Sequence, residues 1–321
     1  MSVTVLCGGV GAARFLRGLL TTVPPVDVAA VVNTGDDTEL HGLSISPDVD
    51  TIVYTLAGAI DTGRGWGLAG ESWHAMEALA RYAEVRPAGS AAAPTWFNLG
   101  DRDLATHFYR TARLAEGATP TQVTAEIARA WQLELALLPM TDGRFRTLVV
   151  LAETGEEVSF QDYFVRLRHS VPVAGVRFEH AAATVTDDAR RALTESDVVV
   201  LAPSNPIVSI GPIRALAGVD DALVARRDTV VAVSPIVAGS ALKGPADRML
   251  AELGVEPSVV GVAELYAPVA SVLVVDPADA DLAGRIEATG MRCVVTPSVM
   301  TEPGVAGRLA EAVLASVNAV G

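Results

Sequence analysis

The feature that most constrains the fold is the alternation of short apolar runs with amphipathic stretches. The apolar runs, which are rich in β-branched residues and which we expect to be strands, span residues 2–7, 26–32, 146–152, 197–202, 228–234, 271–275 and 291–297. The stretches between most of them have the spacing of hydrophobic residues that is typical of helices. Strands that are apolar on both faces and alternate with helices indicate a parallel sheet covered on both sides. The sequence therefore predicts an α/β fold with a Rossmann-like, open and mostly parallel sheet.

One long segment departs from this alternation. Residues 52–140 have a mostly helical pattern, interrupted by an Ala-, Pro- and Gly-rich stretch at 86–96. We expect this segment to be a helical insertion that covers the sheet, within a single Rossmann-like α/β domain over residues 1–321.

Composition excludes some classes of function. The chain has 321 residues and a formal net charge of −14, which disfavours binding to duplex nucleic acid because such binding needs a basic face. No apolar run approaches the roughly 20 residues of a membrane-spanning helix. The N-terminus enters a strand without a basic leader, so we expect a cytoplasmic protein.

The first strand is followed by a glycine-rich turn, LCGGVGAARF, at residues 6–15. Gly8, Gly9 and Gly11 at the start of a helix can expose backbone N–H groups to a phosphate, and Arg14 lies one turn further on. The alternatives are a tight strand-to-helix turn and a solvated arginine. A nicotinamide cofactor is disfavoured, because Arg14 stands where the dinucleotide fingerprint has Gly or Ala and Asn33, rather than an acid, ends the second strand.

Five acidic residues fall within residues 33–51, directly after the second strand. Asp36 and Asp37 follow the strand, and Asp48 and Asp50 precede or begin the next helix. Carboxylates that are held together repel one another unless a cation lies between them, and Mg²⁺ binds one or two carboxylates together with phosphate oxygens. One of the four could also deprotonate a hydroxyl. The alternative is that they are ordinary turn and helix-capping residues.

Three further segments carry polar residues at predicted strand ends or in the insertion. Ser204 and Asn205 follow a buried strand and can bind a nucleotide or cap a turn. The segment 233–250 contains Ser234, Gly239 and Lys243, the only lysine of the chain. The insertion contains Asp101, Arg102 and Asp103 near Trp96, and Asp101 could cap the following helix.

Seven motifs in this order resemble the 2-phospho-L-lactate transferase family of coenzyme F420 biosynthesis, over residues 1 to about 250. They are GGVGAARFLRGL, NTGDD, HGLSISPDVDT, GRGWG, GDRDLATH, APSNPIVSIGPI and SPIVAGSALKGPADRML. The composition favours the actinobacterial branch of this family, which uses phosphoenolpyruvate. Ala12 stands where the family more usually has glycine.

The resemblance implies a Rossmann-like homodimer that needs Mg²⁺. It would transfer a phosphoenolpyruvyl or phospholactyl group from a guanosine diphosphate-linked donor to the deazaflavin Fo, giving dehydro-F420-0 or F420-0 and GMP. From their positions in the sequence, we expect Asp37 and Asp50 as the first metal ligands, with Asp36 or Asp48 orienting or deprotonating the hydroxyl.

The remaining expected site residues are assigned to substrate by the same resemblance. Those facing the diphosphate are Gly8, Gly9, Gly11 and Arg14, and those facing the nucleotide are Ser204, Asn205, Ser234, Gly239 and Lys243. The insertion would form a wall for the acceptor, and the expected contacts there and at the second strand are Asn33, His41, Trp66, Asp101, Arg102 and Asp103.

A second hypothesis is a regulator of the gluconeogenesis-factor type, which binds a nucleotide-sugar without catalysis. Such proteins share the glycine loop and a pair of aspartates. The motifs HGLSISPDVDT and GDRDLATH add a second pair of carboxylates and favour the transferase.

Overall fold

The computed structural model describes residues 1–90, 92–180 and 183–318. Its centre is a seven-stranded sheet in which every neighbouring pair is parallel. The strands, in order across the sheet, are β14 (Arg292–Val295), β13 (Val272–Val275), β10 (Val230–Val233), β9 (Val198–Leu201), β1 (Val3–Cys7), β2 (Val28–Val32) and β5 (Ala136–Pro139). The predicted Rossmann-like α/β fold is confirmed.

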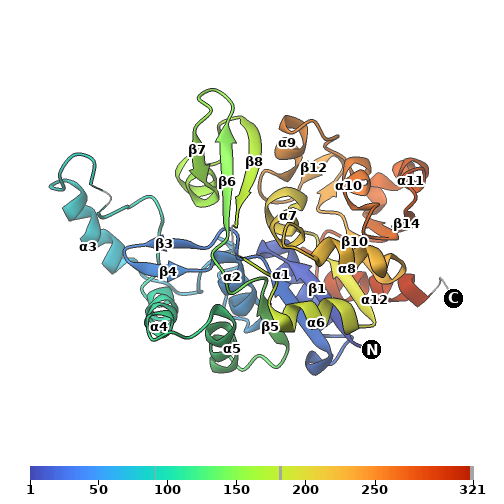
Figure 1. Ribbon diagram of the computed structural model, residues 1–321, viewed down its shortest axis with the longest axis horizontal. Coiled ribbons are helices and arrows are strands. Elements are labelled where there is room, and N and C mark those ends of the chain that lie inside the picture. The colour runs from blue at the N-terminus through green and yellow to red at the C-terminus, as the bar shows by residue number, and fades with distance from the viewer. Residues whose placement is uncertain (91, 181–182, 319–321) are drawn as a thin grey trace.

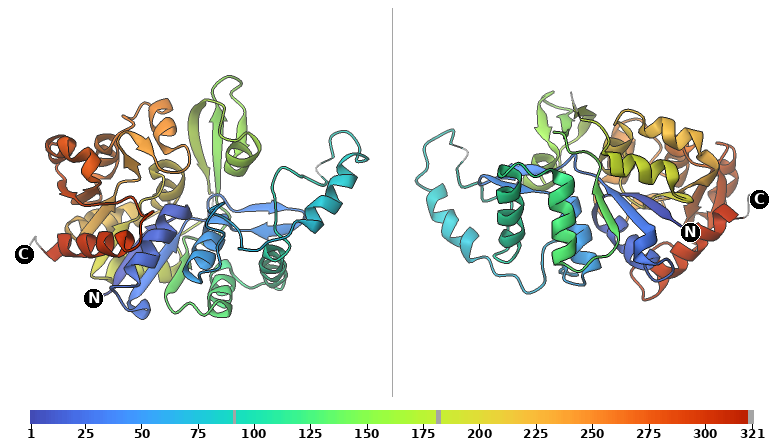
Figure 2. Two further views of the ribbon diagram at one scale, coloured as in Figure 1. Left: turned by 180° about the vertical axis from the view of Figure 1, so that it is seen from behind. Right: turned by 60° about the horizontal axis from the view of Figure 1, so that its bottom comes forward.

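Helices cover both faces of this sheet, and each face has its own hydrophobic core. One face carries α1 (Gly9–Leu19), α2 (Pro47–Leu56), α5 (Pro120–Ala130) and α12 (Val305–Asn318). The other carries α6 (Asp187–Glu195), α7 (Gly211–Arg214), α8 (Val219–Ala225), α9 (Ala246–Glu252), α10 (Val259–Tyr266) and α11 (Ala283–Glu287). In Figure 2, α1 and α12 lie side by side on the first face.

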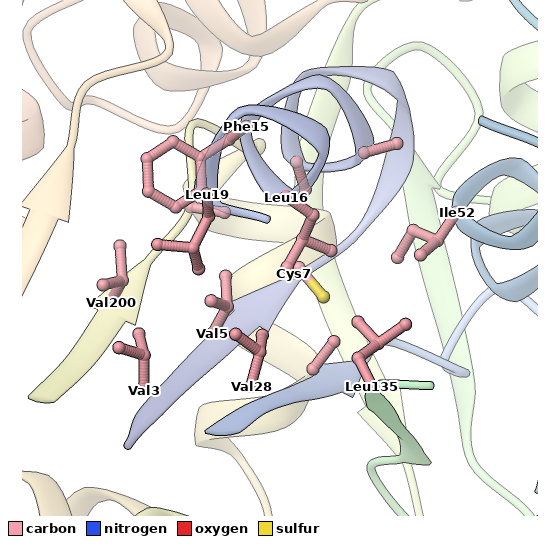
Figure 3. Packing of buried hydrophobic residues seen from close by; sticks show 14 of the residues in the cluster. Val3, Val5, Cys7, Phe15, Leu16, Leu19, Val28, Ile52, Leu135 and Val200 are labelled. Carbon is pink, nitrogen blue, oxygen red and sulfur yellow. The ribbon is translucent and has the colours of Figure 1, made fainter. Parts of the chain in front are cut away.

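The first core shows why β1 and α1 form where they do. Alternate side chains of a strand point to opposite faces, so Val3 and Val5 face α1 while Leu6 enters the other core. Buried residues of α1 recur every three or four positions, as in Phe15 and Leu19, and pack over β1 (Figure 3). The helix therefore begins directly after the strand and places its N-terminus at the strand's carboxyl end.

The predicted helical segment at about 52–140 contains α3 (His74–Ala83), α4 (Asp103–Ala115) and α5. It also contains β5, the edge strand of the main sheet, which sequence analysis missed because only four residues form it. A hairpin of β3 (Thr38–Leu40) and β4 (Leu43–Ile45) extends beside these helices (Figure 1).

The strand predicted at 146–152 exists as β6 (Arg146–Leu151), but it does not join the main sheet. It pairs antiparallel with β7 (Glu157–Ser159) and β8 (Val173–Glu179) in a small sheet that stands above the main one (Figure 1). Its placement in a parallel Rossmann-like sheet was therefore wrong. A continuous apolar run indicates burial but does not identify the neighbour, and here residues of helical segments, such as Tyr163, Val208 and Met249, cover the small sheet.

The remaining elements are short: the hairpin strands β11 (Ile236–Val237) and β12 (Ser240–Ala241), and the helical turns Pro25–Asp27, Asp162–Arg166, Pro206–Ile210, Arg227–Thr229 and Pro277–Leu282. Among the described residues, no helix combines the length and the hydrophobicity needed to cross a membrane.

Candidate active site

The carboxyl ends of β1 and β9 meet where the chain reverses its direction of winding, the usual place for a ligand in such sheets. Ser204, which follows β9, joins the two ends: its Oγ donates to the Gly8 carbonyl at 2.8 Å and accepts from the Gly8 N–H at 3.3 Å. Gly8 and Gly11 allow close approach here. A Cβ on Gly11 would lie 2.3 Å from the Pro203 carbonyl oxygen.

The four predicted aspartates come together at the carboxyl end of β2. Asp36 follows β2, while Asp48 and Asp50 lie in the first turn of α2. Asn33 joins the two segments, because its Nδ2 donates to Asp36 Oδ1 at 3.1 Å and to Asp48 Oδ2 at 2.9 Å. Asn33 is fully buried and positions these carboxylates; its expected contact with substrate stays a prediction.

Asp37 differs from the other three aspartates because its side chain is exposed, whereas Asp36, Asp48 and Asp50 are buried. Asp37 Oδ2 accepts a hydrogen bond from Ser46 Oγ at 2.8 Å. Asp36 is held from the other side by Gln161 Nε2, which donates to its carbonyl at 3.2 Å and to its Oδ2 at 3.4 Å. Gln161 follows β7, so the small antiparallel sheet contributes to the cluster.

Burial and mutual repulsion raise the pKa values of three of these carboxyl groups. Burial, with the charges of Asp48 and Asp37, raises the pKa of Asp36 well above its usual range. Burial raises the pKa of Asp48 to about 6, although hydrogen bonds from Asn33 and the Gly9 backbone lower it. Desolvation likewise raises the pKa of Asp37 to about 8, against the Ser46 hydroxyl and the charge of Arg110. Because water reaches the Asp37 side chain, solvent screening weakens this effect.

The raised pKa of Asp48 predicts a pH dependence of stability. The native state holds a proton on Asp48 that the unfolded chain releases near pH 4, so the stability due to this group is lost as the pH rises from 4 to about 6. Asp48→Asn should therefore be more stable than the wild type at pH 7 by roughly 2 kcal/mol, with the difference vanishing near pH 4. Urea unfolding of both proteins at several pH values measures this, and a difference that grows toward acid pH would contradict it.

Asp50 has a different environment, because Arg110 of α4 binds it. Arg110 Nη1 donates to Asp50 Oδ2 at 3.1 Å and its Nη2 donates to Asp50 Oδ1. Both carboxylate oxygens of Asp50 are therefore engaged by one guanidinium. This contact counts against our assignment of Asp50 as a metal ligand.

A buried polar chain continues behind Arg110. His107 Nδ1 lies 3.3 Å from Arg110 Nη1, and His107 Nε2 lies 3.4 Å from Asp103 Oδ2. Asp103 Oδ1 accepts a hydrogen bond from the Tyr54 hydroxyl at 2.5 Å. Burial would raise the pKa of Asp103, but the nearby His107 imidazole, the hydrogen bond from Tyr54 and the charge of Arg110 hold it below its usual value. Asp103 thus belongs to the interior between α2 and α4 and does not form the expected acceptor wall.

A cavity of about 700 Å³ opens from this cluster. Its lining comes from the end of β2, the β3–β4 hairpin, α4, α5 and the small antiparallel sheet, and includes Asp36, Asp37, Ser46, Arg110, Trp96 and Gln161. A second cavity of about 800 Å³ shares Glu39, Leu40 and Trp96 with it and also contains His41. His41 and Gly42 form the turn of the hairpin with φ of 57° and 71°.

The other predicted acceptor contacts lie outside both cavity linings. Trp66 packs edge-on against Trp73, and the Arg64 guanidinium stacks on both rings. Asp101 caps α3 in place of its own helix, accepting from the His74 and Ala75 N–H groups.

Glu71 takes the corresponding role at α4, accepting from the Arg102 and Asp103 N–H groups at 2.8 and 2.9 Å. The Arg102 side chain donates to the Ala69 carbonyl. The prediction that Asp101 caps the helix that follows it was therefore wrong.

The predicted nucleotide contacts have mixed outcomes. Asn205 Oδ1 accepts from the Ile207 and Val208 N–H groups and so caps the turn after β9. Ser234 Oγ bonds within its own turn, to the N–H and carbonyl of Ile236. Gly239 has a φ of 75° in the β11–β12 hairpin.

Lys243, in contrast, lies against Gly65 of the GRGWG loop, which itself lies near Val10 of the glycine loop. A Cβ built on Gly65 would lie 2.4 Å from Lys243 Nζ and 4.0 Å from Val10 Cγ2. Three distant segments, the glycine loop, the GRGWG loop and the loop after β12, therefore meet beside the N-terminus of α1. Arg14, half-buried in α1, lies one turn from this point.

Comparison with known proteins identifies the family. The model of the family described as 2-phospho-L-lactate transferase CofD matches residues 3–308. The chain belongs to this family. A phosphoenolpyruvate transferase of Streptomyces coelicolor is 41% identical over 318 residues, covering 98% of this chain and 97% of the relative. Another of Mycobacterium ulcerans is 40% identical and covers 97% of each chain.

A solved structure supports the fold. A member of the upf0052 family from Bacillus halodurans superposes with a TM-score of 0.61 at 15% identity, and the match covers 98% of each chain. At this identity the likeness bears on the fold alone.

Sequence analysis missed three residues that lie in or beside this candidate site: Arg110, His107 and Gln161. His107 was visible in the GDRDLATH motif, where its spacing of four from Asp103 puts both on one face of a helix. Arg110 follows on the same face, three residues later. Gln161 had no signal, because only the unexpected antiparallel sheet brings it to Asp36.

Proposed function

We propose that this protein transfers a phosphoenolpyruvyl or phospholactyl group from a guanosine diphosphate-linked donor to a hydroxyl of the deazaflavin Fo, with release of GMP. Membership of the CofD family supports the transferase class, and the relatives named phosphoenolpyruvate transferase favour the enolpyruvyl donor. The observation that carries the proposal is the cavity beside the aspartates. At about 700 Å³ it has the size of a small-molecule site and a reactive, electron-rich end at Asp36 and Asp37.

The chemistry assigned to these residues is a displacement at phosphorus. The acceptor oxygen forms a bond to the distal phosphorus of the donor, the bond from that phosphorus to the bridging oxygen breaks, and GMP leaves with the bond's electron pair. The proton of the acceptor hydroxyl passes to a carboxylate. We assign this role to Asp36, which lines the cavity and whose environment favours proton uptake.

The residues present fit a magnesium ion. Within the described chain, no group of three or more His, Cys, Asp or Glu side chains is arranged to hold a metal by itself. Mg²⁺ needs fewer, because it binds one or two carboxylates together with substrate phosphate oxygens and water. We propose that exposed Asp37 is the principal ligand, with Asp36 or Asp48 beside it, and that the ion would neutralise charge on the diphosphate.

The substrates divide between two regions. We propose that the donor diphosphate lies near the glycine loop and Arg14, with Lys243 within reach, and that the acceptor lies in the cavity. Its flat ring would then lie near Trp96 and His41, where we had expected Trp66 and Asp103. A homodimer, which the family resemblance implies, is part of the same proposal, and sedimentation velocity would test it.

Mass spectrometry of the purified protein with Fo, MgCl₂ and enolpyruvyl-diphosphoguanosine tests the proposal directly. Conversion of Fo to the dehydro-F420-0 mass with release of GMP is the expected result, and the lactyl donor distinguishes the two donor classes. An unchanged Fo with either donor would refute the transfer and favour the nucleotide-sugar-binding regulator.

Chelation gives a separate prediction. EDTA in excess over the ion should stop the transfer, because the carboxylate cluster and the diphosphate would then repel each other, and added Mg²⁺ should restore it. Turnover measured by GMP release before and after each addition checks this. Transfer that continues after exhaustive dialysis against EDTA would contradict the metal requirement.

A further inference from the structure

Arg110 is a buried cation at the edge of a cluster of four carboxylates. Only 4% of it is exposed, yet it contributes to the lining of the cavity that Asp36 and Asp37 border. Within the part of the chain that the structure describes, it is the only arginine or lysine that forms an ion pair with a member of the quartet, and that member is Asp50. One positive charge therefore faces four potential negative charges.

The contacts of Arg110 direct this charge to Asp50 in preference to the other three aspartates. Its two terminal nitrogens bind the two oxygens of Asp50, in the two-pronged geometry that makes arginine–carboxylate pairs specific. Arg110 Nη1 is also 3.4 Å from the Ser44 carbonyl and 3.3 Å from His107 Nδ1. These contacts hold the guanidinium on Asp50, although its charge also acts on Asp37.

A series of buried polar side chains, His107, Asp103 and Tyr54, lies behind Arg110 and helps to hold it in place. His107 is 1% exposed and is held between Arg110 and Asp103, whose other oxygen accepts from Tyr54. Tyr54 belongs to α2, as Asp50 does, so this series of side-chain contacts starts and ends on the same helix. Arg110 therefore cannot leave Asp50 without disturbing buried polar contacts between α2 and α4.

We propose that Arg110 is a positioning residue that neutralises Asp50 and withholds its carboxylate from the divalent cation. The ion is then taken by the carboxylates that face the cavity, and Asp50 acts only as the anchor of Arg110. This inference rests on the proposed function, because it supposes that a divalent cation binds the cluster. It reverses the ligand role that we expected for Asp50 from its position in the sequence.

The competing explanation is an ion pair that only joins two helices. The same helix offers a comparison, because Arg113 of α4 binds Glu126 of α5 through two contacts of 2.9 and 3.0 Å, away from the aspartates. If the role of Arg110 were purely structural, replacing it would leave the affinity for the cation unchanged, as we expect for Arg113. A positioning role predicts a change in the affinity for the cation that Arg113 does not share.

Calorimetric titration of the full-length protein with MgCl₂, in the presence of GDP as a stand-in for the donor diphosphate, tests this. Arg110→Gln should bind Mg²⁺ roughly tenfold more tightly than the wild type, because the freed Asp50 adds a negative charge to the cluster. Transfer activity should fall at the same time. Arg113→Gln is the matched control and should leave Mg²⁺ affinity unchanged.

The double variant Asp50→Asn/Arg110→Gln keeps the test decisive if the single variant, which leaves a buried carboxylate unpaired, fails to fold. It removes one charge of each sign, so its Mg²⁺ affinity should stay within about threefold of the wild type. A loss of more than tenfold would show that Asp50 is itself a ligand and overturn the inference. Unchanged affinity in a folded Arg110→Gln would also overturn it.

The same titration separates this inference from the proposed function. If the wild type with GDP binds no Mg²⁺, the metal-dependent mechanism fails and the role of Arg110 fails with it. If the wild type binds Mg²⁺ but the affinities of the variants depart from these expectations, only the role of Arg110 is wrong.

Discussion

Asp37→Asn should reduce the rate of transfer by at least about 100-fold while leaving the fold intact. Asp37 is the member of the quartet that is exposed toward the cavity, so it can reach a cation and the substrate without any rearrangement. Asparagine keeps the shape and can still accept the hydrogen bond from Ser46, but it removes the charge that attracts a divalent cation. The loss of a general base or of a metal ligand has effects of this order. Steady-state GMP release measures the rate.

The stability of Asp37→Asn distinguishes a chemical effect from unfolding. Because the side chain is exposed, we expect its free energy of unfolding to change by less than about 1 kcal/mol. Asp188→Asn is a suitable control, since Asp188 pairs with Arg191 on the exposed face of α6, far along the chain from the site. Asp37→Asn with activity within a few-fold of the wild type would remove Asp37 from the mechanism.

The parallel sheet could be predicted because its determinants are local. Strands β1, β9, β10 and β13 are each a short run of buried, mostly aliphatic residues, and such a run indicates a strand covered on both faces whatever lies next to it. The same signal could not assign β6 to the correct sheet, because burial on two sides does not identify the neighbour. Strand β5 was hidden among helices by its length of four residues.

The site was predictable only to the extent that its residues are adjacent in sequence. Asp36 and Asp37 follow β2 and Asp48 begins α2, so their meeting at one sheet edge follows from the order of strand and helix. Arg110 and Gln161 arrive from α4 and from the small sheet, 60 residues after Asp50 and 125 residues after Asp36. No local pattern determines such a meeting.

The hydrogen-bond partners of polar residues near the glycine loop could also not be predicted from the sequence. Ser204 and Asn205 have the same side-chain chemistry whether they bind a nucleotide or the backbone, and in the structure their oxygens bind Gly8 and the turn after β9. Ser204 therefore shapes the loop on which the donor would lie. Gly8 belongs to the glycine loop and also lies against the aspartate cluster. A displacement of one of these two parts of the site would therefore displace the other.

Gly8→Ala should disrupt this contact between the glycine loop and the aspartate cluster and lower the rate of transfer by roughly 100-fold. The backbone of Gly8 is extended, with φ of −165°, so alanine can adopt it without strain. The new Cβ would instead lie 2.4 Å from Asp48 Oδ2 and 3.0 Å from Ser209 Cβ. Asp48 is the closest obstacle and must move, and with it Asn33, which it binds. Displacements of about 1 Å in a site of this kind cost on the order of 100-fold in rate.

Gly284→Ala is the control that separates the effect of the new contact with Asp48 from the general cost of replacing glycine. Gly284 lies in α11, and a Cβ there meets no other heavy atom within 4 Å. Alanine in this helix should raise the free energy of unfolding by about 0.5–1 kcal/mol and leave the transfer rate unchanged. Gly8→Ala should instead lower the free energy of unfolding by about 1–3 kcal/mol, the usual cost of overpacking. Equal rates for the two variants would mean that Asp48 can be displaced without consequence, and that the aspartate cluster acts independently of the glycine loop.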